Sequence, residues 1–227
     1  MHTASQFAAG VFSLSFAAAS FAGVADRGFF EWDIEFLPPG VELFGGADEA
    51  DVTPGAVTFR LHFVANESLS LNGFNLGTLA NPGLTPERIY FNGTVFNHAF
   101  GGDSQPNQAL IPAFPELAFD SYFAIGNQAI SFVPGSQNLS GANGEIIGTW
   151  FTQPPIAMNA GDRLLALQVT IQALPDSWIG GNGSSIGVGF ADNTTAVFDV
   201  PLARIPSPGA CGMLALAGAV ASRRRRS

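Results

Sequence analysis

The sequence predicts an all-β fold, namely an antiparallel β-sandwich with jelly-roll or immunoglobulin-like topology. Three observations lead to this prediction. Apolar and polar residues alternate with a period of two in many short segments, as in strands with one face on a core and one in water. Clusters of Asn, Gly and Pro separate these segments. Between Gly23 and Ile205 there is no amphipathic helix pattern of twelve or more residues.

The clearest alternation predicts strands at residues 30–36, 57–63, 165–171, 186–190 and 196–200. In the first of these, Phe30, Trp32 and Ile34 share one face, and acidic residues occupy the other. Further strands are expected at residues 88–96, 117–125, 129–133 and 145–151, with long surface loops at 99–115 and 134–144. The pair Asn92-Gly93 lies between apolar runs and predicts a tight hairpin turn.

One predicted strand contains a phase slip. Leu69 and Leu71 fit one face, whereas Phe74 and Leu76 fit that face only after an extra residue at Asn72-Gly73. An extra residue with a glycine beside it is the sequence mark of a β-bulge. We therefore expect a strand at residues 69–76 that is interrupted by a bulge.

Length and charge limit the function classes. Residues 23–204 are enough for one sandwich domain with a sizeable core. This body has five arginines, eighteen acidic residues and no lysine, which argues against a nucleic-acid partner, because nucleic acid requires clustered positive charge. The single cysteine, Cys211, lies near the C-terminus, so the body has no disulfide and must be stabilised by packing.

The N-terminus resembles a secretory signal peptide. Residues 7–21 are apolar or small, and Ser20 and Ala22 are small residues suited to cleavage by signal peptidase. The sequence changes abruptly to acidic after Gly23. We therefore expect residues 1–22 to be a signal peptide that directs export.

The C-terminal segment, residues 205–227, has three parts. Prolines break the chain, an uncharged stretch at 210–222 suits a helix too short for a stable membrane span, and four arginines form a basic stop. This arrangement resembles the PEP-CTERM family of sorting signals, although Ser207 stands where that family has Glu. The resemblance implies an exosortase-like sorting enzyme as partner, transient membrane anchoring and a cell-envelope, cell-surface or extracellular location. The motif residues are Ile205, Pro206, Ser207, Pro208, Gly209, Arg223, Arg224, Arg225 and Arg226.

The body resembles exported β-rich proteins of unknown role, of the kind found in planctomycetes, at residues 114–127 and 148–155. That resemblance implies no catalytic residues. Our leading hypothesis is therefore a non-enzymatic envelope or matrix protein. The alternative is a polysaccharide-binding surface module whose ligand contacts are aromatic, since sugar faces stack on rings. The candidate contacts are Tyr90, Trp150 and Trp178.

Other chemistry receives less support from the sequence. A glycosidase requires two carboxylates in a cleft, and the candidates are Glu31, Asp33, Glu35, Glu116 and Asp120. Calcium takes six to eight oxygen ligands, and Asp48, Glu49 and Asp51 form a weak candidate loop for it. No other cofactor is expected. His62 and His98 are expected to be surface histidines.

Overall fold

The computed structural model describes residues 25–37, 56–77, 87–98, 100–134, 136–139, 144–172 and 177–205. The predicted signal peptide, the acidic loop with Asp48, Glu49 and Asp51, and the segment from Pro206 to Ser227 lie outside these residues. Within the described residues the chain is all-β with antiparallel strands, which confirms the prediction of an all-β fold. No helix among them has the length and apolar character needed to cross a bilayer.

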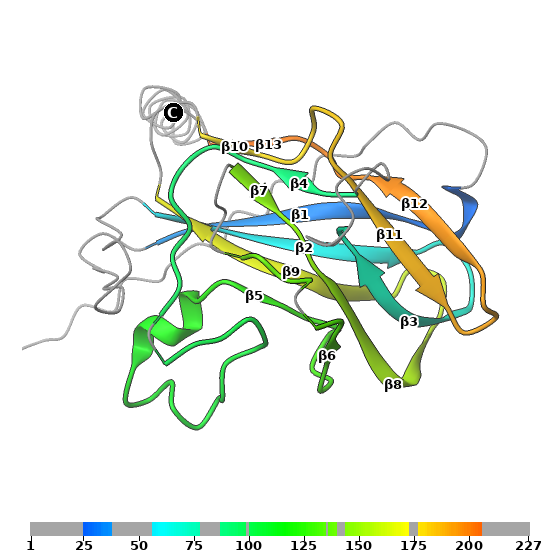
Figure 1. Ribbon diagram of the computed structural model, residues 1–227, viewed down its shortest axis with the longest axis horizontal. Helices are drawn as coiled ribbons and strands as arrows, with labels where there is room; N and C mark the ends of the chain where they lie inside the picture. Colours follow the sequence, from blue (N-terminus) through cyan, green and yellow to red (C-terminus); the bar gives the residue numbers. More distant parts are fainter. Residues whose placement is uncertain are drawn as a thin grey trace, which may run out of the picture.

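The described residues form four antiparallel sheets. The first has the order β1-β2-β9-β5, the second β12-β11-β3-β8-β6, and the pairs β4-β7 and β10-β13 are small (Figure 1). The long strands are β1 (Gly28–Phe36), β2 (Val57–Ala65), β3 (Leu69–Asn75), β8 (Thr149–Met158), β9 (Arg163–Ile171), β11 (Ser185–Phe190) and β12 (Thr195–Asp199). The short elements are β4 (Ile89–Tyr90), β5 (Tyr122–Phe123), β6 (Ser131–Phe132), β7 (Glu145–Ile146), β10 (Trp178–Ile179) and β13 (Ala203–Arg204), with 3-10 turns at Ala25–Arg27 and Pro115–Phe119.

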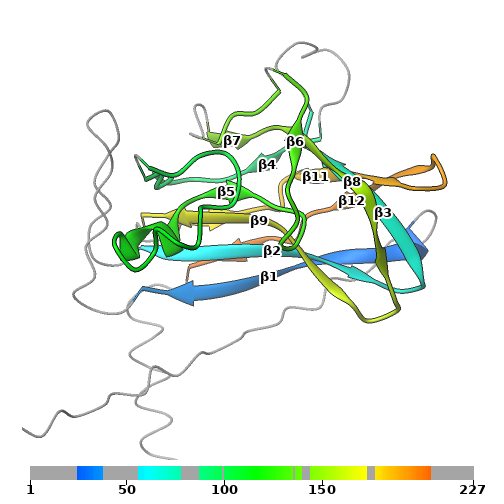
Figure 2. The same cartoon turned by 90° about the horizontal axis from the view of Figure 1, so that it is seen from below.

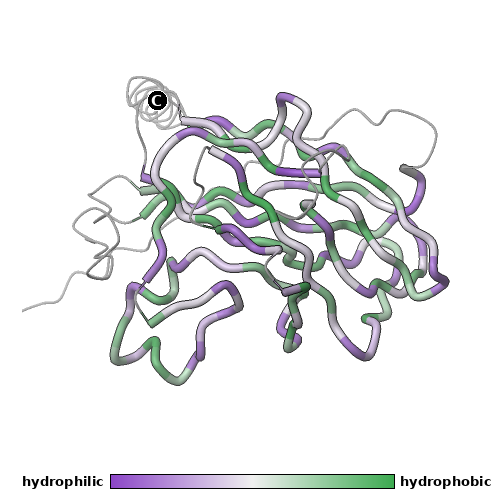
Figure 3. The backbone as a smooth tube through the Cα atoms, viewed as in Figure 1, coloured by the Kyte–Doolittle hydropathy of each residue, from purple (hydrophilic) through white to green (hydrophobic). Residues whose placement is uncertain are grey.

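The two larger sheets pack face to face over one core. Their strands run obliquely to each other, and the chain passes between the sheets from β2 to β3 and from β8 to β9 (Figures 1 and 2). The rings of Phe30 and Phe63 from the first sheet contact Phe74 and Phe198 from the second, with centroids 5.6–6.5 Å apart. Hydrophobic and hydrophilic segments alternate along the strands accordingly (Figure 3).

The predicted bulge in β3 is confirmed. Leu71 pairs with Phe190 and Gly73 pairs with Gly189, so Asn72 is the extra residue opposite β11. The side-chain amide of Asn72 donates to the Phe190 carbonyl at 3.1 Å. The bulge therefore keeps both Leu71 and Phe74 buried in the core, which a regular alternation would not allow.

Several short segments differ from the prediction. The prediction of a hairpin turn at Asn92-Gly93 is wrong. β4 pairs with β7 instead, and Phe91 forms a β-bridge with Ile179. Asn92 exchanges hydrogen bonds with Trp178: its N–H donates to the Trp178 carbonyl, and its side-chain oxygen accepts from the Trp178 N–H. The expected strand at 117–125 is partly wrong, because Pro115–Phe119 is a 3-10 turn and only Tyr122–Phe123 pairs in the sheet.

The described part of the core includes the first residue of the predicted tail. Ile205, which the sequence assigns to the sorting motif, is 8% exposed and packs in the main core. Its N–H donates to the Ser177 carbonyl at 2.9 Å. Ile205 therefore contributes to the folded body, and the next residue is Pro206.

Gly73 and Gly189 face each other across β3 and β11, yet alanine should affect them oppositely. A Cβ on Gly73 would clash with the Trp150 carbonyl oxygen and lie 2.9 Å from the Phe151 Cα, whereas a Cβ on Gly189 would have its nearest neighbour at 3.9 Å. We expect Gly73→Ala to lower the free energy of unfolding by about 1–3 kcal/mol. Gly189→Ala should leave it unchanged or raise it by up to about 1 kcal/mol. Urea denaturation of both variants measures this, and equal losses would contradict the register.

Candidate functional site

Two of the three predicted ligand aromatics share one face. The bridge between Phe91 and Ile179 joins β4 to β10, so β7, β4, β10 and β13 follow one another side by side. Phe91 and Ile179 are buried and point inward. Tyr90 and Trp178, their neighbours along the strands, are half-buried on the outward face. In this register they are diagonal neighbours, a spacing of roughly 7–8 Å.

Arginines flank this aromatic pair. The Arg88 guanidinium lies 5.9 Å from the centre of the Tyr90 ring and forms an ion pair of 2.6 Å with Glu145. Arg204 is the cross-strand partner of Trp178 and is exposed. We call the set Arg88, Tyr90, Asn92, Trp178 and Arg204 the aromatic face. Together it offers two rings, two guanidinium groups and one amide on a surface of short strands.

The third predicted aromatic does not belong to this face. Trp150 is 0% exposed, and its indole N–H donates to the Ala124 carbonyl at 2.8 Å. Its ring packs against Phe74 and Phe123 with centroids 5.4 and 4.5 Å apart. The prediction of Trp150 as a ligand contact is therefore wrong, because its alternation in β8 turns it into the core.

The carboxylates of β1 are engaged in ion pairs across the first sheet. Arg163 on β9 reaches both Glu31 and Asp33, and Arg60 on β2 contacts Glu35 at 2.6 Å. The Nδ1 atom of His62 lies 3.6 Å from the Asp33 carboxylate. Each of these three carboxylates is thus paired with an arginine of β2 or β9, an arrangement that stabilises a sheet face and does not leave two carboxylates facing a cleft.

The second predicted carboxylate pair surrounds a buried histidine. His98 is 9% exposed, so the prediction of a surface histidine is wrong here. Its Nδ1 accepts from the Phe100 N–H at 3.1 Å, and its Nε2 lies 3.5 Å from Glu116. The Asp120 carboxylate accepts from the His98 N–H at 2.7 Å. These contacts close the loop before β5, and the rings of Phe100 and Phe114 cover the imidazole. Sequence reasoning missed this because the contacts join residues about twenty positions apart inside a loop.

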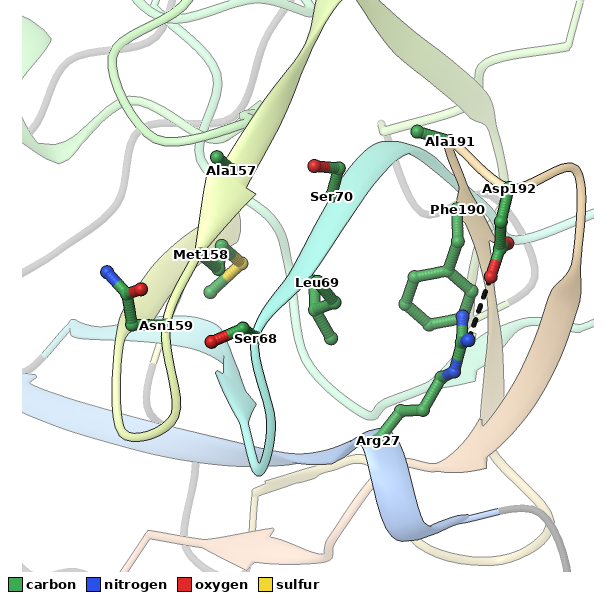
Figure 4. Close-up of a pocket in the computed structure, with 10 residues that line it drawn as sticks. All are labelled: Arg27, Ser68, Leu69, Ser70, Ala157, Met158, Asn159, Phe190, Ala191 and Asp192. Atoms are coloured by element: carbon green, nitrogen blue, oxygen red, sulfur yellow. Dashed lines mark hydrogen bonds and ion pairs between the residues drawn. The ribbon is translucent and has the colours of Figure 1, made fainter.

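A cavity of about 630 Å³ opens where β3 begins and where β8 and β11 end (Figure 4). The Arg27 guanidinium lies over the Phe190 ring at 4.7 Å and contacts Asp192 at 2.8 Å. A second carboxylate, Glu67, lies 3.2 Å from Arg27, and Arg27 holds the pKa of Asp192 well below its usual range. The Arg27 guanidinium in this cavity is therefore already paired with two carboxylates.

A groove of about 300 Å³ crosses the outer face of the second sheet. Cross-strand partners form two rows on this face: Thr195, Gly189, Gly73 and Phe151 in one, and Val197, Gly187, Asn75 and Thr149 in the other. Three of these eight positions are glycine, so β3 and β11 form a floor of bare backbone between side chains on β12 and β8. We call this the glycine-floored groove.

The predicted calcium and sorting residues are not placed by the structure. Asp48, Glu49 and Asp51 lie outside the described residues, as do Pro206–Gly209 and the four C-terminal arginines. In the part of the chain that is described, no group of three or more His, Cys, Asp or Glu side chains gathers that could hold a metal ion. No family model, curated protein or solved structure matches this chain.

His62 should make stability depend on pH. Burial lowers the pKa of its imidazole below the usual value and outweighs the opposing effect of Asp33. The unfolded chain therefore binds a proton at His62 more readily than the folded chain does. The stability linked to the neutral form of His62 is fully present above the unfolded pKa of about 6.5 and is lost as the pH falls through the folded pKa. We expect the free energy of unfolding to fall less between about pH 7.5 and about pH 5 in His62→Gln than in the native chain, as measured by urea denaturation. Identical pH slopes would contradict this role.

Proposed function

We propose that this chain is an exported protein of the cell envelope whose β-sandwich, of jelly-roll or immunoglobulin-like type, binds a polysaccharide on the aromatic face. The observation that carries the binding proposal is the position of Tyr90 and Trp178. They are 88 residues apart in the sequence, yet they are diagonal neighbours on adjacent short strands, with their rings on the outward side.

The chemistry of this face suits a sugar polymer. Aromatic rings provide a large apolar contact at a small cost in conformational entropy, and the polar groups beside them fix orientation. Arg204, the cross-strand partner of Trp178, is exposed, and its guanidinium can donate hydrogen bonds to hydroxyl groups.

Export and sorting account for the two ends of the sequence. Ile205 is the last residue that the structure describes and lies in the core, and the first proline of the motif is at the next position. A cleavage near Pro206 would therefore leave the described core complete. The role assigned to the body is binding, without a catalytic step, and the pairing of the β1 carboxylates with Arg60 and Arg163 supports this view.

Removing the Trp178 ring should abolish most of the polysaccharide binding. We expect Trp178→Ala in the full chain to bind insoluble cellulose, chitin or mannan at least about tenfold more weakly than the native chain, which corresponds to about 1.4 kcal/mol. Sedimentation of protein with the polymer measures the affinity. Phe100→Ala is the matched control, because this ring is 62% exposed but lies in the loop before β5, away from the aromatic face. Equal binding by Trp178→Ala and the native chain would refute the site.

Deleting residues 206–227 should change where the protein is retained but not whether it folds. We expect the full chain in the envelope fraction and the truncated chain in the medium, with the same midpoint of thermal unfolding for both bodies. Cell fractionation followed by immunoblotting measures this. A full chain that stays in the cytoplasm, or a truncation that leaves the location unchanged, would contradict the sorting proposal.

A further inference from the structure

The floor of the glycine-floored groove has two glycines that the fold itself does not require. Neither Gly187 nor Gly189 has a positive φ. A Cβ on Gly187 would have its nearest neighbour, the Asn75 Cβ, at 3.4 Å, and a Cβ on Gly189 would be 3.9 Å from the nearest atom. Glycine weakens a strand interior and there often marks a place where a ligand approaches the backbone. The missing side chains therefore serve to keep the groove open.

The groove cannot take an extended peptide as an added strand. β3 pairs on both sides, with β11 and β8, and β11 pairs on both sides, with β12 and β3. The backbone groups of the floor are thus used within the sheet, whereas strand addition requires a free sheet edge. Recognition in this groove must come from side chains and from apolar contact with the floor.

The side chains at one end of the groove form a fixed polar network. The Thr149 hydroxyl donates to the Asn75 side-chain oxygen at 2.6 Å, and the Asn75 amide donates to Glu87 at 3.0 Å. This network orders a hydroxyl, an amide and a carboxylate before any ligand arrives, which reduces the entropy lost on binding. Such groups pair well with the hydroxyl groups of a sugar.

The walls and the charge limit the ligand further. Phe151 on β8 is the cross-strand partner of Gly73, and Val197 on β12, which is 54% exposed, lies on the other side of the groove. Both sides of the groove therefore offer apolar contact. Among the described residues that line the groove, Glu87 is the one that is charged, and the whole chain has a net charge of −9. Charge complementarity therefore disfavours anionic ligands, and the hydroxyl-binding network favours a neutral one.

We propose that the glycine-floored groove binds a neutral saccharide, with a ring lying on the floor at Gly187 and Gly189 and its hydroxyl groups paired with Asn75, Thr149 and Glu87. This second site goes beyond the aromatic face and does not depend on it. Glu87, at the end of the groove, directly precedes Arg88 of the aromatic face in the sequence. One polymer chain can therefore contact both sites.

The proposal is tested with a substitution, Gly189→Val, that adds a side chain to the groove while keeping the fold. The full chain is titrated with short soluble oligosaccharides of neutral glucans, mannans and xylans by isothermal titration calorimetry. We expect Gly189→Val to bind the best of these at least tenfold more weakly, with an unfolding midpoint equal to or above that of the native chain. Gly102→Val is the matched control, because a Cβ on Gly102 meets nothing within 4 Å and the residue lies outside the groove, so its binding should be unchanged.

Two further variants separate the possible outcomes. Glu87→Gln should weaken binding while keeping the shape of the groove, and Trp178→Ala should leave the affinity for short oligosaccharides unchanged even where it abolishes binding to insoluble polymer. Native affinity in Gly189→Val, or no binding of any neutral oligosaccharide, would overturn the proposal. Binding of an anionic saccharide or a peptide with higher affinity, lost in Gly189→Val, would overturn the ligand class.

Discussion

The packing of aromatic rings between the two large sheets is the constraint on which the rest of the structure depends. Phe30 and Phe63 on one sheet meet Phe74 and Phe198 on the other, and Trp150 continues the contact to Phe123. Burial of one such side chain contributes about 1.5–3 kcal/mol, and each favourable ring pair about 0.5–1.5 kcal/mol more. Since the body has no cysteine, this interlocking of rings takes the place of covalent bonds between the sheets.

The position of the outward surfaces follows from this inward packing. Because Phe74 and Val188 must face the core, their neighbours Gly73, Gly187 and Gly189 face outward and form the floor of the groove. The bulge at Asn72 shifts β3 by one residue and brings Gly73 opposite Gly189. In the same way, the inward positions of Phe91 and Ile179 turn Tyr90 and Trp178 outward. Both candidate binding surfaces are thus the reverse side of the core.

The sequence predicts β1, β2, β9, β11 and β12 to within two residues because apolar and polar residues alternate along them. It predicts β8 only in part, because this strand continues to Met158, beyond the expected strand at 145–151. The bulge was also readable, since it breaks the phase between Leu71 and Phe74. The short strands β10 and β13 were not readable, because two paired residues are too few to show a period. His98 was misjudged for a related reason: its burial comes from Phe100, Phe114 and Asp120, which are brought together by the path of a loop.

Residue type alone predicted the candidate binding surfaces only in part. The search for aromatic residues that could stack on a sugar identified Tyr90 and Trp178, which the structure places on one face. The same search also included Trp150, which is in the core. The groove could not be found in this way, because its main feature is the absence of side chains at positions that belong to different strands. Only the register of β12, β11, β3 and β8 brings those glycines together.

Chemical-shift mapping by NMR is the most direct test of saccharide binding on these two outward surfaces. Titration of the labelled full chain with a neutral oligosaccharide long enough to reach both sites should perturb the amides of Gly187 and Gly189 and the indole N–H of Trp178. The indole N–H of the buried Trp150 should respond much less. Perturbations confined to the cavity around Arg27, or none at all for any neutral saccharide, would contradict the account.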